Sequence, residues 1–369
     1  MRKNENYICT VGVLSGNQKP HRNCPQGKKA RIMKEMIIYA EKRQVLVYFF
    51  YSLDVDWRHQ LIKGLRWKGN KWVSEFYAFP DIVYNRIPSR TLENRKVAQY
   101  LLQKFNEDEN LYVFNSRYLD KWEVYQTLSN HPLGDELLPE TRLFTYSNLE
   151  ELMSRYSEVY LKPINSSRGK GIIKIKTTGA NTYAYAHAEF PRTNWNRCFS
   201  FKALCEALNS LIAGKNDYLV QKGIELARFQ DRIFDLRTQV QKDGEGKWLM
   251  TGVGVRVAGR NRIVTHIPNG GFLAAYDEVM LENFGPSKEI RQQLDWQLKR
   301  IAKQVPVILE KGLSINLDIL SIDIGVDSNG KMWVIEANSK PASFDENDIR
   351  QRHLKYLVDY CIFIAQNKK

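Results

Sequence analysis

The sequence has few cysteines, and they form no recognisable motif. The five that occur, Cys9, Cys24, Cys198, Cys205 and Cys361, are odd in number and contain no C-x-x-C spacing. This argues against a disulfide framework and against a zinc knuckle. We therefore expect free thiols in a reducing compartment such as the cytoplasm.

Long apolar runs are also missing. The most apolar stretch, VLVYFFYSL at 45–53, is too short to cross a bilayer, and the opening MRKNENYICT contains no apolar segment of signal-peptide length. We therefore expect a soluble chain without a membrane partner. Low-complexity tracts are absent too, and a hydrophobic content of 43% is high enough for buried cores, which argues against extensive disorder.

Negative charge is the minority sign. Lysine and arginine number 55 against 41 aspartates and glutamates, a formal net charge of +14. An excess of this size indicates an anionic partner. The basic residues are scattered, and no nucleic-acid-binding signature is present. Nucleotide phosphate is therefore a better candidate partner than nucleic acid.

The apolar patterns predict a mixed α/β (α+β) chain. At 369 residues we expect two or three domains. The first hundred or so residues alternate strand-like and helix-like runs, which predicts a βαβ unit, and from 218 the pattern becomes antiparallel. The expected elements are strands at 8–14, 45–51, 80–87 and 111–114, helices at 29–43, 91–105, 119–129 and 287–311, a helix in SNLEELMSRY capped by Ser147, and a terminal helix.

A glycine-containing loop lies between two expected strands in YLKPINSSRGKGIIKI, from 160. A Walker A loop would need glycine at 164 and serine or threonine at 171, where this chain has Ile164 and Gly171. A dinucleotide fingerprint would need glycine at 174, where this chain has Lys174. Two interpretations remain open. The loop is either a basic hairpin turn or a flexible flap whose amides and lysines close on phosphate oxygens.

A second pattern, SIDIGVDSNGKMWVIEAN, predicts a hairpin turning at 328–329. In that register Asp323 shares a sheet face with Val334, Glu336 and Asn338. Oxygen ligands of this kind suit a hard cation such as Mg²⁺, because it retains waters and substrate phosphates. The alternative is that the two acids pair with buried arginines, and the residues alone leave both interpretations open.

A third pattern is the hairpin FDLRTQVQ…TGVGVRVA. If its turn lies near 244–245, Asp235, Arg237 and Arg256 share one face, opposite Gly252 and Gly254, which leave room for a ligand. Two arginines beside a cleft are suited to bidentate contact with phosphate or carboxylate. An exposed charged face is the alternative.

In eight stretches taken in order, the chain resembles the ATP-grasp superfamily, and more closely its spore-coat-associated YheC/YheD-like branch: PDIVYNRI, SRYLDKWEVYQTL, YLKPINSSRGKGI, LVQKGIEL, FDLRTQVQ, GVGVRVA, HIPNGG and IEAN. The resemblance covers most of the chain. It implies an ATP-grasp fold with an N-terminal α/β pre-grasp domain (1–115), an N-terminal ATP-grasp part with a mobile lid (116–220) and a C-terminal antiparallel-sheet catalytic domain (221–369). ATP would be held between the last two.

The resemblance also implies an ATP site. Lys121 and Lys162 look like ATP-contacting lysines, and 164–171 resembles the lid loop that covers the phosphates and excludes water. The stretch LVQKGIEL resembles the linker whose backbone reads the adenine edge. The implied nucleotide-binding residues are Lys121, Lys162, Ser166, Ser167, Gly169, Lys170, Gly171, Gln221, Lys222, Ile224 and Glu225.

Metal and substrate residues follow from the same resemblance. Asp323, Glu336 and Asn338 match the family's metal ligands, which implies Mg²⁺ beside ATP, and Arg237 and Arg256 match catalytic positions near the γ-phosphate. The stretch HIPNGG resembles the substrate loop. Its implied substrate-binding residues are His266, Asn269, Gly270 and Gly271.

The implied activity is that of an ATP-dependent carboxylate–amine ligase. A carboxylate attacks the γ-phosphate to give an acylphosphate and ADP, and an amine then displaces phosphate to form an amide. The sequence identifies neither substrate, so small molecules, peptides and proteins stay open, as does the oligomeric state. The alternative is a spore-coat-associated structural or nucleotide-binding protein that keeps the fold with little turnover.

Overall fold

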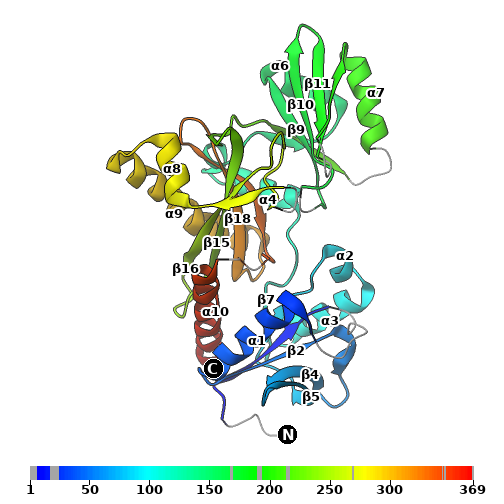
Figure 1. Ribbon diagram of the computed structural model, residues 1–369. Coiled ribbons are helices and arrows are strands. Elements are labelled where there is room, and N and C mark those ends of the chain that lie inside the picture. Colours follow the sequence, from blue (N-terminus) through cyan, green and yellow to red (C-terminus); the bar gives the residue numbers. More distant parts are fainter. Residues whose placement is uncertain are drawn as a thin grey trace.

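The computed structural model arranges the chain in three parts, with an N-terminal part below, a C-terminal sheet in the middle and a smaller lid sheet above (Figure 1). It describes residues 6–16, 25–166, 169–188, 193–212, 217–267, 270–342, 344 and 346–367. Among these residues, no helix is both long and apolar enough to cross a membrane.

The N-terminal part is built on a seven-stranded mixed sheet. Strands β2, β1, β6 and β7 are parallel and adjacent in that order, and β3, β4 and β5 extend the sheet antiparallel beyond β2. Their bounds are β1 (Cys9–Leu14), β2 (Val45–Phe50), β3 (Val55–Asp56), β4 (Leu61–Lys68), β5 (Lys71–Ala78), β6 (Ile82–Asn85) and β7 (Tyr112–Phe114). Every residue of β2 is buried, as is typical of a parallel strand covered on both faces.

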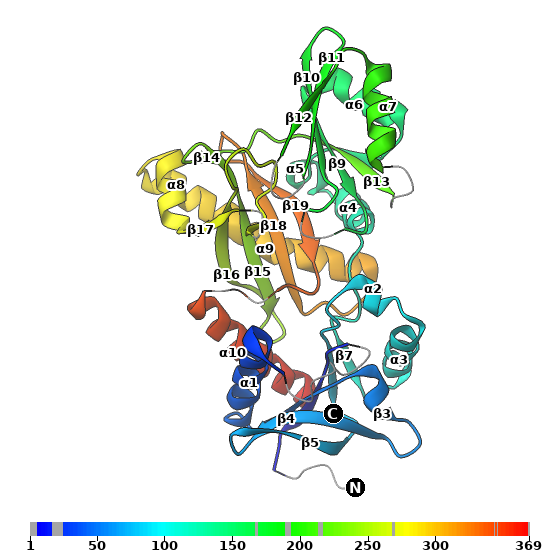
Figure 2. The ribbon, with the colours of Figure 1, turned by 45° about the vertical axis from the view of Figure 1, so that its right-hand side comes forward.

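Helices cover both faces of this sheet. On one face, α1 (Gly27–Glu41) lies beside the C-terminal helix α10 (Asn347–Asn367), and both pack into one apolar cluster with β1 (Figure 2). On the other face, α3 (Lys96–Glu107) packs through a second cluster. Two short helical turns, η1 (Ser52–Asp54) and α2 (Arg90–Glu93), complete the part. One face of the sheet is therefore covered by one helix from the start of the chain and another from its end.

The lid is a six-stranded antiparallel sheet in the order β12-β11-β10-β9-β13-β8. Its strands are β8 (Thr141–Leu143), β9 (Glu158–Pro163), β10 (Ile173–Gly179), β11 (Thr182–His187), β12 (Trp195–Cys198) and β13 (Tyr218–Lys222). The helices α6 (Tyr146–Arg155) and α7 (Phe201–Ile212) pack on it through a shared apolar cluster. The connecting segment before the lid forms α4 (Lys121–Ser129) and α5 (Gly134–Leu137).

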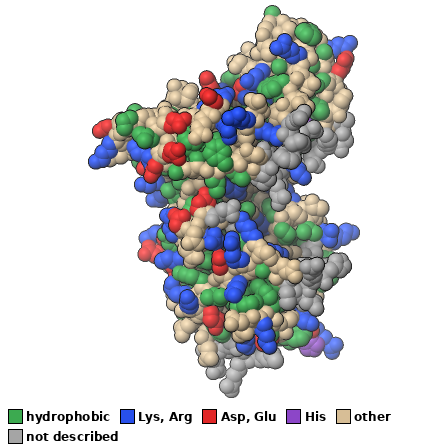
Figure 3. Space-filling model, viewed as in Figure 1, with side chains coloured by type: hydrophobic (Ala, Val, Ile, Leu, Met, Phe, Trp, Pro, Cys, Tyr) green, Lys and Arg blue, Asp and Glu red, His purple; other side chains and the backbone are tan. Residues whose placement is uncertain are grey.

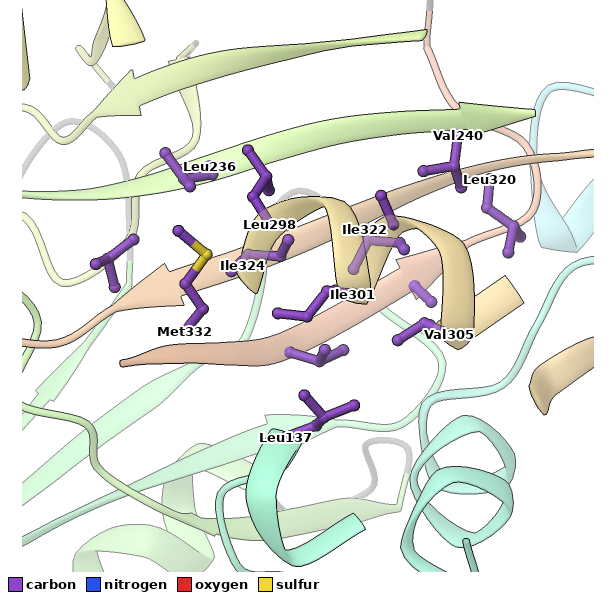
Figure 4. Close-up of a cluster of buried hydrophobic side chains, with 14 of the residues drawn as sticks. Leu137, Leu236, Val240, Leu298, Ile301, Val305, Leu320, Ile322, Ile324 and Met332 are labelled. Atoms are coloured by element: carbon purple, nitrogen blue, oxygen red, sulfur yellow. The ribbon is translucent and has the colours of Figure 1, made fainter. Parts of the chain in front are cut away.

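The C-terminal sheet has the order β17-β16-β15-β18-β19, and β14 (Arg228–Phe229) pairs with β15. Its strands are β15 (Arg232–Lys242), β16 (Trp248–Val257), β17 (Phe272–Ala274), β18 (Ile319–Val326) and β19 (Met332–Asn338). The helices α8 (Tyr276–Phe284) and α9 (Lys288–Leu313) pack against one face. Figure 4 shows Leu298 and Ile301 of α9 beside Ile322 and Ile324 of β18. Because strand residues alternate between faces, the polar residues are left on the other face.

Several elements differ from the sequence-based expectation. The helix α6 is capped by Thr145, whose Oγ1 accepts the Asn148 amide at 3.0 Å, so the expected cap Ser147 already lies inside the first turn. The patterns also missed α5, α8, β11, β12, β14 and β17. Most of these are short, and β12 exposes three of its four residues, which leaves no alternation to detect.

Candidate active site

A cavity of about 690 Å³ opens between the three parts of the chain. Its walls are the free face of the C-terminal sheet, the edge of the lid and the carboxyl ends of the N-terminal strands. It brings together most of the predicted site residues: Lys162, Gly169, Gln221, Lys222, Ile224, Arg237, Arg256, His266, Asp323, Glu336 and Asn338. The site residues that the sequence scattered over about 180 positions therefore converge.

Strand register places the charged side chains of the C-terminal sheet in neighbouring positions. Asp235 on β15 lies opposite Arg256 on β16, so the two residues share a face, as the sequence pattern predicted. Arg237 lies opposite Asp323 on β18, and Asp323 lies opposite Glu336 on β19. Four adjacent strands thus contribute to one charged surface.

The β18–β19 hairpin does not follow the regular alternation of faces that the sequence predicted. Ile324 pairs with Val334, but the next pair is Asp323 with Glu336, so Ile335 is an extra residue in a β-bulge. As a result Val334 packs into the apolar core, with 2% of its surface exposed, and does not share the face of Glu336. The prediction that placed Val334 on the acidic face is therefore wrong, and the bulge is what brings Glu336 opposite Asp323.

Arg256 is held between two carboxylates. Its Nε and Nη2 donate to Oδ1 and Oδ2 of Asp235 at 2.8 and 2.5 Å, and its Nη2 lies 2.9 Å from Oδ2 of Asp323. The Thr265 hydroxyl donates to the same Asp235 at 2.6 Å. Burial raises the pKa of Asp323, but the charges of Arg256 and Arg237 outweigh this effect and hold the pKa below its ordinary value. Asp235 and Asp323 both therefore form ion pairs with Arg256.

One oxygen of this group is left without a partner. Asp323 Oδ1 is buried and accepts no hydrogen bond from the described residues. Glu336 and Asn338 line the same cavity. Among the described residues, no three His, Cys, Asp or Glu side chains gather as a metal site, so a cation here would also need the Asn338 amide, water and phosphate oxygens. That donor set fits Mg²⁺, which usually keeps several waters.

Lys121 reaches the acidic residues from helix α4. The Asp120 carboxylate caps this helix by accepting hydrogen bonds from the backbone amides of Trp122 and Glu123. Lys121 is therefore the first helical residue. Its Nζ lies 3.5 Å from Oε1 of Glu336 and donates to the backbone carbonyl of Ser166 in the lid loop. Lys121 therefore connects the C-terminal sheet to the lid, although it does not line the cavity wall itself.

Lys162 enters the cavity from strand β9 of the lid. Its Nζ donates to Oε1 of Gln221 at 2.5 Å, and the Gln221 amide donates to the Thr141 hydroxyl at 2.8 Å. Burial lowers the pKa of Lys162 to about 8, although the charge of Glu336 acts in the opposite direction. An anion arriving beside this ammonium group would raise the pKa again.

The predicted adenine linker is divided between two cavities. Ile224 lines both the main cavity and a neighbouring one of about 870 Å³, whereas Glu225 lines only the neighbouring one. Lys222 borders both; its amide donates to the Glu140 carbonyl at 2.8 Å, and its Nζ lies 4.8 Å from the centre of the Tyr156 ring. The structure thus places Ile224 and Lys222 with the other predicted residues, and Glu225 apart from them.

The lid loop contains two glycines with left-handed backbone angles, Gly169 (φ 71°) and Gly171 (φ 75°). A Cβ on Gly169 would lie 3.3 Å from Cγ2 of Val264, so the lid loop lies close to the segment just before the predicted substrate loop. A Cβ on Gly171 would lie 2.8 Å from Cγ of Pro163. Lys170 between them is exposed and is not part of the cavity wall.

The predicted substrate loop reaches the cavity only in part. His266 lines it, but the amides of Gly270 and Gly271 both donate to the Ile267 carbonyl at 3.1 Å. A Cβ on Gly271 would lie 2.6 Å from the Val257 carbonyl oxygen, so glycine is needed there for packing against β16. Two predicted residues lie outside the described part of the chain: Ser167 and Asn269.

The space beside Gly252 and Gly254 is not available to a ligand. A Cβ on Gly252 would lie 2.6 Å from Cγ1 of Ile349, and a Cβ on Gly254 would lie 2.9 Å from Oε1 of Glu346. Both neighbours belong to the start of α10 or the residue before it. The expectation of ligand room at these glycines is therefore wrong, because α10 fills it.

Sequence reasoning missed the contribution of the N-terminal part. Ser15, Lys29 and Arg86 line the cavity, as does Lys340, whose Nζ forms a buried ion pair with Glu93. Ser15 and Arg86 directly follow strands β1 and β6. Carboxyl ends of parallel strands are common ligand sites, so the strand pattern around Arg86 was the signal available.

The chain is similar to a known family and to two described proteins. Residues 110–364 match the YheC/D-like ATP-grasp family. The chain is 27% identical to the endospore coat-associated protein YheD of Bacillus subtilis (strain 168), over 90% of this chain and 72% of that protein. It is 25% identical to the endospore coat-associated protein YheC of the same organism, over 73% of each.

Solved structures share the fold at much lower identity. D-cycloserine synthetase DcsG superposes with a TM-score of 0.54 at 10% identity, covering 98% of this chain and 100% of its own. The D-alanyl-alanine synthetase A from Vibrio cholerae O1 biovar eltor str. N16961 gives 0.51 at 10% identity, covering 97% and 98%. Because the family model covers more than half of its length, the chain belongs to the YheC/D-like ATP-grasp family.

Proposed function

We propose that this protein is an ATP-dependent carboxylate–amine ligase that works with Mg²⁺-ATP through an acylphosphate. The observation that carries the proposal is Asp323 Oδ1, a buried carboxylate oxygen without a partner among the described residues. It lies in one cavity with Glu336, Asn338, two arginines and the lid residue Lys162. A chain that used this fold only as a scaffold would have no need to bury such an oxygen, because burial without a partner is costly.

The two lysines and the lid loop are assigned to the nucleotide. Lys162 faces the cavity from β9, and Lys121 is bonded to the loop at Ser166. Gly169 and Gly171 allow the loop backbone to adopt the left-handed angles that a close approach requires. Exclusion of water by this loop would protect an acylphosphate from hydrolysis.

Asp323, Glu336 and Asn338 are assigned to the cation. When bound, Mg²⁺ would supply positive charge to the phosphate oxygens. The two arginines have different surroundings. Arg256 is occupied by two carboxylates and orients Asp323, whereas Arg237 donates only to the Ser321 hydroxyl, at 3.1 Å, among the described residues. Arg237 is therefore the better donor to the transferring phosphoryl group.

The reaction needs no covalent intermediate with the protein. A carboxylate oxygen of the substrate attacks the γ-phosphorus, the bond to the bridging oxygen breaks, and ADP leaves. The amine nitrogen then attacks the acyl carbon, loses a proton and expels phosphate. Fixed positive charge around the phosphoryl group is the main source of rate in such transfers. The relatives YheD and YheC are described as endospore coat-associated, and we propose the spore coat as the place where this chain acts.

The test is ADP release from Mg²⁺-ATP in the presence of paired carboxylates and amines, including amino acids, acidic peptides and coat-protein extracts, followed by mass spectrometry of the product. We expect ADP release that requires both substrates, and a product whose mass equals their sum minus water. Thermal melting with Mg²⁺-ATP is measured in parallel, because a ligand of the native state raises its stability. Stabilisation without ADP release in any pairing would favour the non-catalytic nucleotide-binding alternative.

A further inference from the structure

The N-terminal end of the cavity lies at the switch point of its sheet. From β1 the chain continues to β2 on one side, and it later places β6 on the other side. In open α/β sheets, ligands bind outside the carboxyl ends of the strands at this reversal of order. Ser15 follows β1, Arg86 follows β6, and both line the cavity. This end is therefore in the position of a ligand site, separate from the charged surface of the C-terminal sheet.

Positive charge is in excess at this end. The cations that line it are Lys28, Lys29, Arg86, Lys340 and Arg350. The two carboxylates nearby are already paired, Glu93 with Lys340 and Glu35 with Arg350. In the space-filling view, Lys and Arg side chains gather beside the hollow between the upper and lower parts (Figure 3).

Lys29 and Arg86 carry the unbalanced charge. Arg86 donates to the Pro341 carbonyl at 3.0 Å and to the Tyr84 hydroxyl at 3.3 Å, and neither it nor Lys29 has a carboxylate within ion-pair distance in the described part of the chain. Lys29 is exposed at the cavity mouth, but partial desolvation lowers its pKa and the charge of Arg86 lowers it further, so the two groups repel each other. An anion between them would relieve that repulsion.

Part of the cavity wall is apolar. Ile32, Ile87 and Leu354 line it, together with Met33 and Met36. We propose that the substrate of the ligase carries a second acidic group, a carboxylate or a phosphate, that binds at Lys29 and Arg86, while an uncharged chain spans the apolar wall to the reacting carboxylate. This inference rests on the proposed function for the reacting end, but the second anion site is defined by its own residues.

The test measures binding, so it can be read even without turnover. Glutarate, adipate and pimelate are titrated into the full chain with Mg²⁺ and a non-hydrolysable ATP analogue, each beside the monocarboxylate of equal chain length. We expect the best dicarboxylate to bind about tenfold more tightly than its monocarboxylate, because a charge-assisted contact is added. A phosphonocarboxylate of the same length shows by its relative affinity which acidic group the site prefers.

Two variants locate the site. Lys29→Gln should lower dicarboxylate affinity about tenfold and leave monocarboxylate and nucleotide affinity unchanged, since only one charge-assisted contact is removed. Arg86→Gln should do the same. The matched control is Lys42→Gln, an exposed lysine just beyond the other end of α1. Equal affinity for mono- and dicarboxylates, or a preference that survives both variants, would overturn the second site. Failure of the ligase itself would instead appear as absent ADP release with these binding results intact.

Discussion

Arg256 on β16 and Asp323 on β18 form an ion pair at 2.9 Å although strand β15 runs between their strands. The guanidinium spans that distance by also binding Asp235 on the intervening strand. One arginine therefore ties three consecutive strands together on the face that lines the cavity. It also binds one oxygen of Asp323 and leaves the other without a hydrogen-bond partner among the described residues.

The first prediction separates the roles of the two arginines. Arg256→Met should leave two buried carboxylates facing each other, at a cost of about 3–5 kcal/mol in unfolding free energy. Arg237→Met removes a guanidinium bonded to a neutral hydroxyl, so it should cost much less stability and lower turnover by about 10²-fold. Urea unfolding and ADP release measure the two effects. Equal destabilisation by both variants would contradict the division of roles.

The second prediction concerns Glu336. Its contact with Lys121 is single and 3.5 Å long, so Glu336→Gln should cost no more than about 1 kcal/mol in stability. The same change removes an anionic ligand, so the Mg²⁺ concentration needed for ATP binding should rise strongly. Melting temperature is compared with ATP affinity over a Mg²⁺ titration, with Glu278→Gln on the exposed side of α8 as the control. A large loss of stability with unchanged Mg²⁺ dependence would mean that the acids serve ion pairing alone.

The third prediction is a pH dependence. Burial lowers the pKa of Lys162 to about 8, so the free protein loses this charge as the pH rises through that value. Bound phosphate favours the protonated form, and Mg²⁺-ATP affinity should therefore fall above pH 8, with up to one proton taken up on binding near pH 8.5. Between pH 8 and 10.5 Lys162 is protonated in the unfolded chain but neutral in the native protein. The contribution of this residue to the free energy of unfolding therefore rises with pH over this range. Calorimetry in buffers of different ionisation enthalpy should show uptake that Lys162→Met abolishes; identical uptake in both proteins would exclude Lys162.

The fourth prediction tests the lid loop with two matched glycines. Gly171 and Gly285 have nearly the same φ, 75° and 76°, and Gly285 also has a ψ of −177°, a combination that almost only glycine adopts, so alanine should cost about 1–3 kcal/mol in stability at either position. A Cβ on Gly285 meets nothing within 4 Å, whereas one on Gly171 lies 2.8 Å from Pro163. We expect both alanine variants to lose stability, and Gly171→Ala alone to raise the KM for ATP. A similar KM change at Gly285 would show that the effect is not specific to the loop.

Alternation along strands explains why much of the site could be predicted. Asp235 and Arg256 share a face as predicted, but they are directly opposite each other only because the register shifts by one residue between Gln239 and Val240. Neither this irregularity nor the bulge at Ile335 can be read from the turns of the two hairpins. The loss of space at Gly252 could not be predicted either, because Ile349 lies almost a hundred positions further along the chain.

The cations of the N-terminal end were missed for a related reason. Neither Lys29 nor Arg86 belongs to a motif, and their proximity follows from the order of the parallel strands. A sequence pattern predicts which strands exist more readily than how they are ordered. The expected fold was confirmed, but the proposed substrate end became visible only with the sheet assembled.

The position of α10 has a consequence for how the protein is made. Leu354, Leu357 and Val358 pack against Val11 and Val13 of the first strand, which leaves the ribosome more than three hundred residues earlier. One face of the first sheet must therefore stay partly uncovered until residues 347–367 have been synthesised. A nascent chain that stalls before residue 347 would expose this apolar face, and we expect it to need a chaperone or to be degraded.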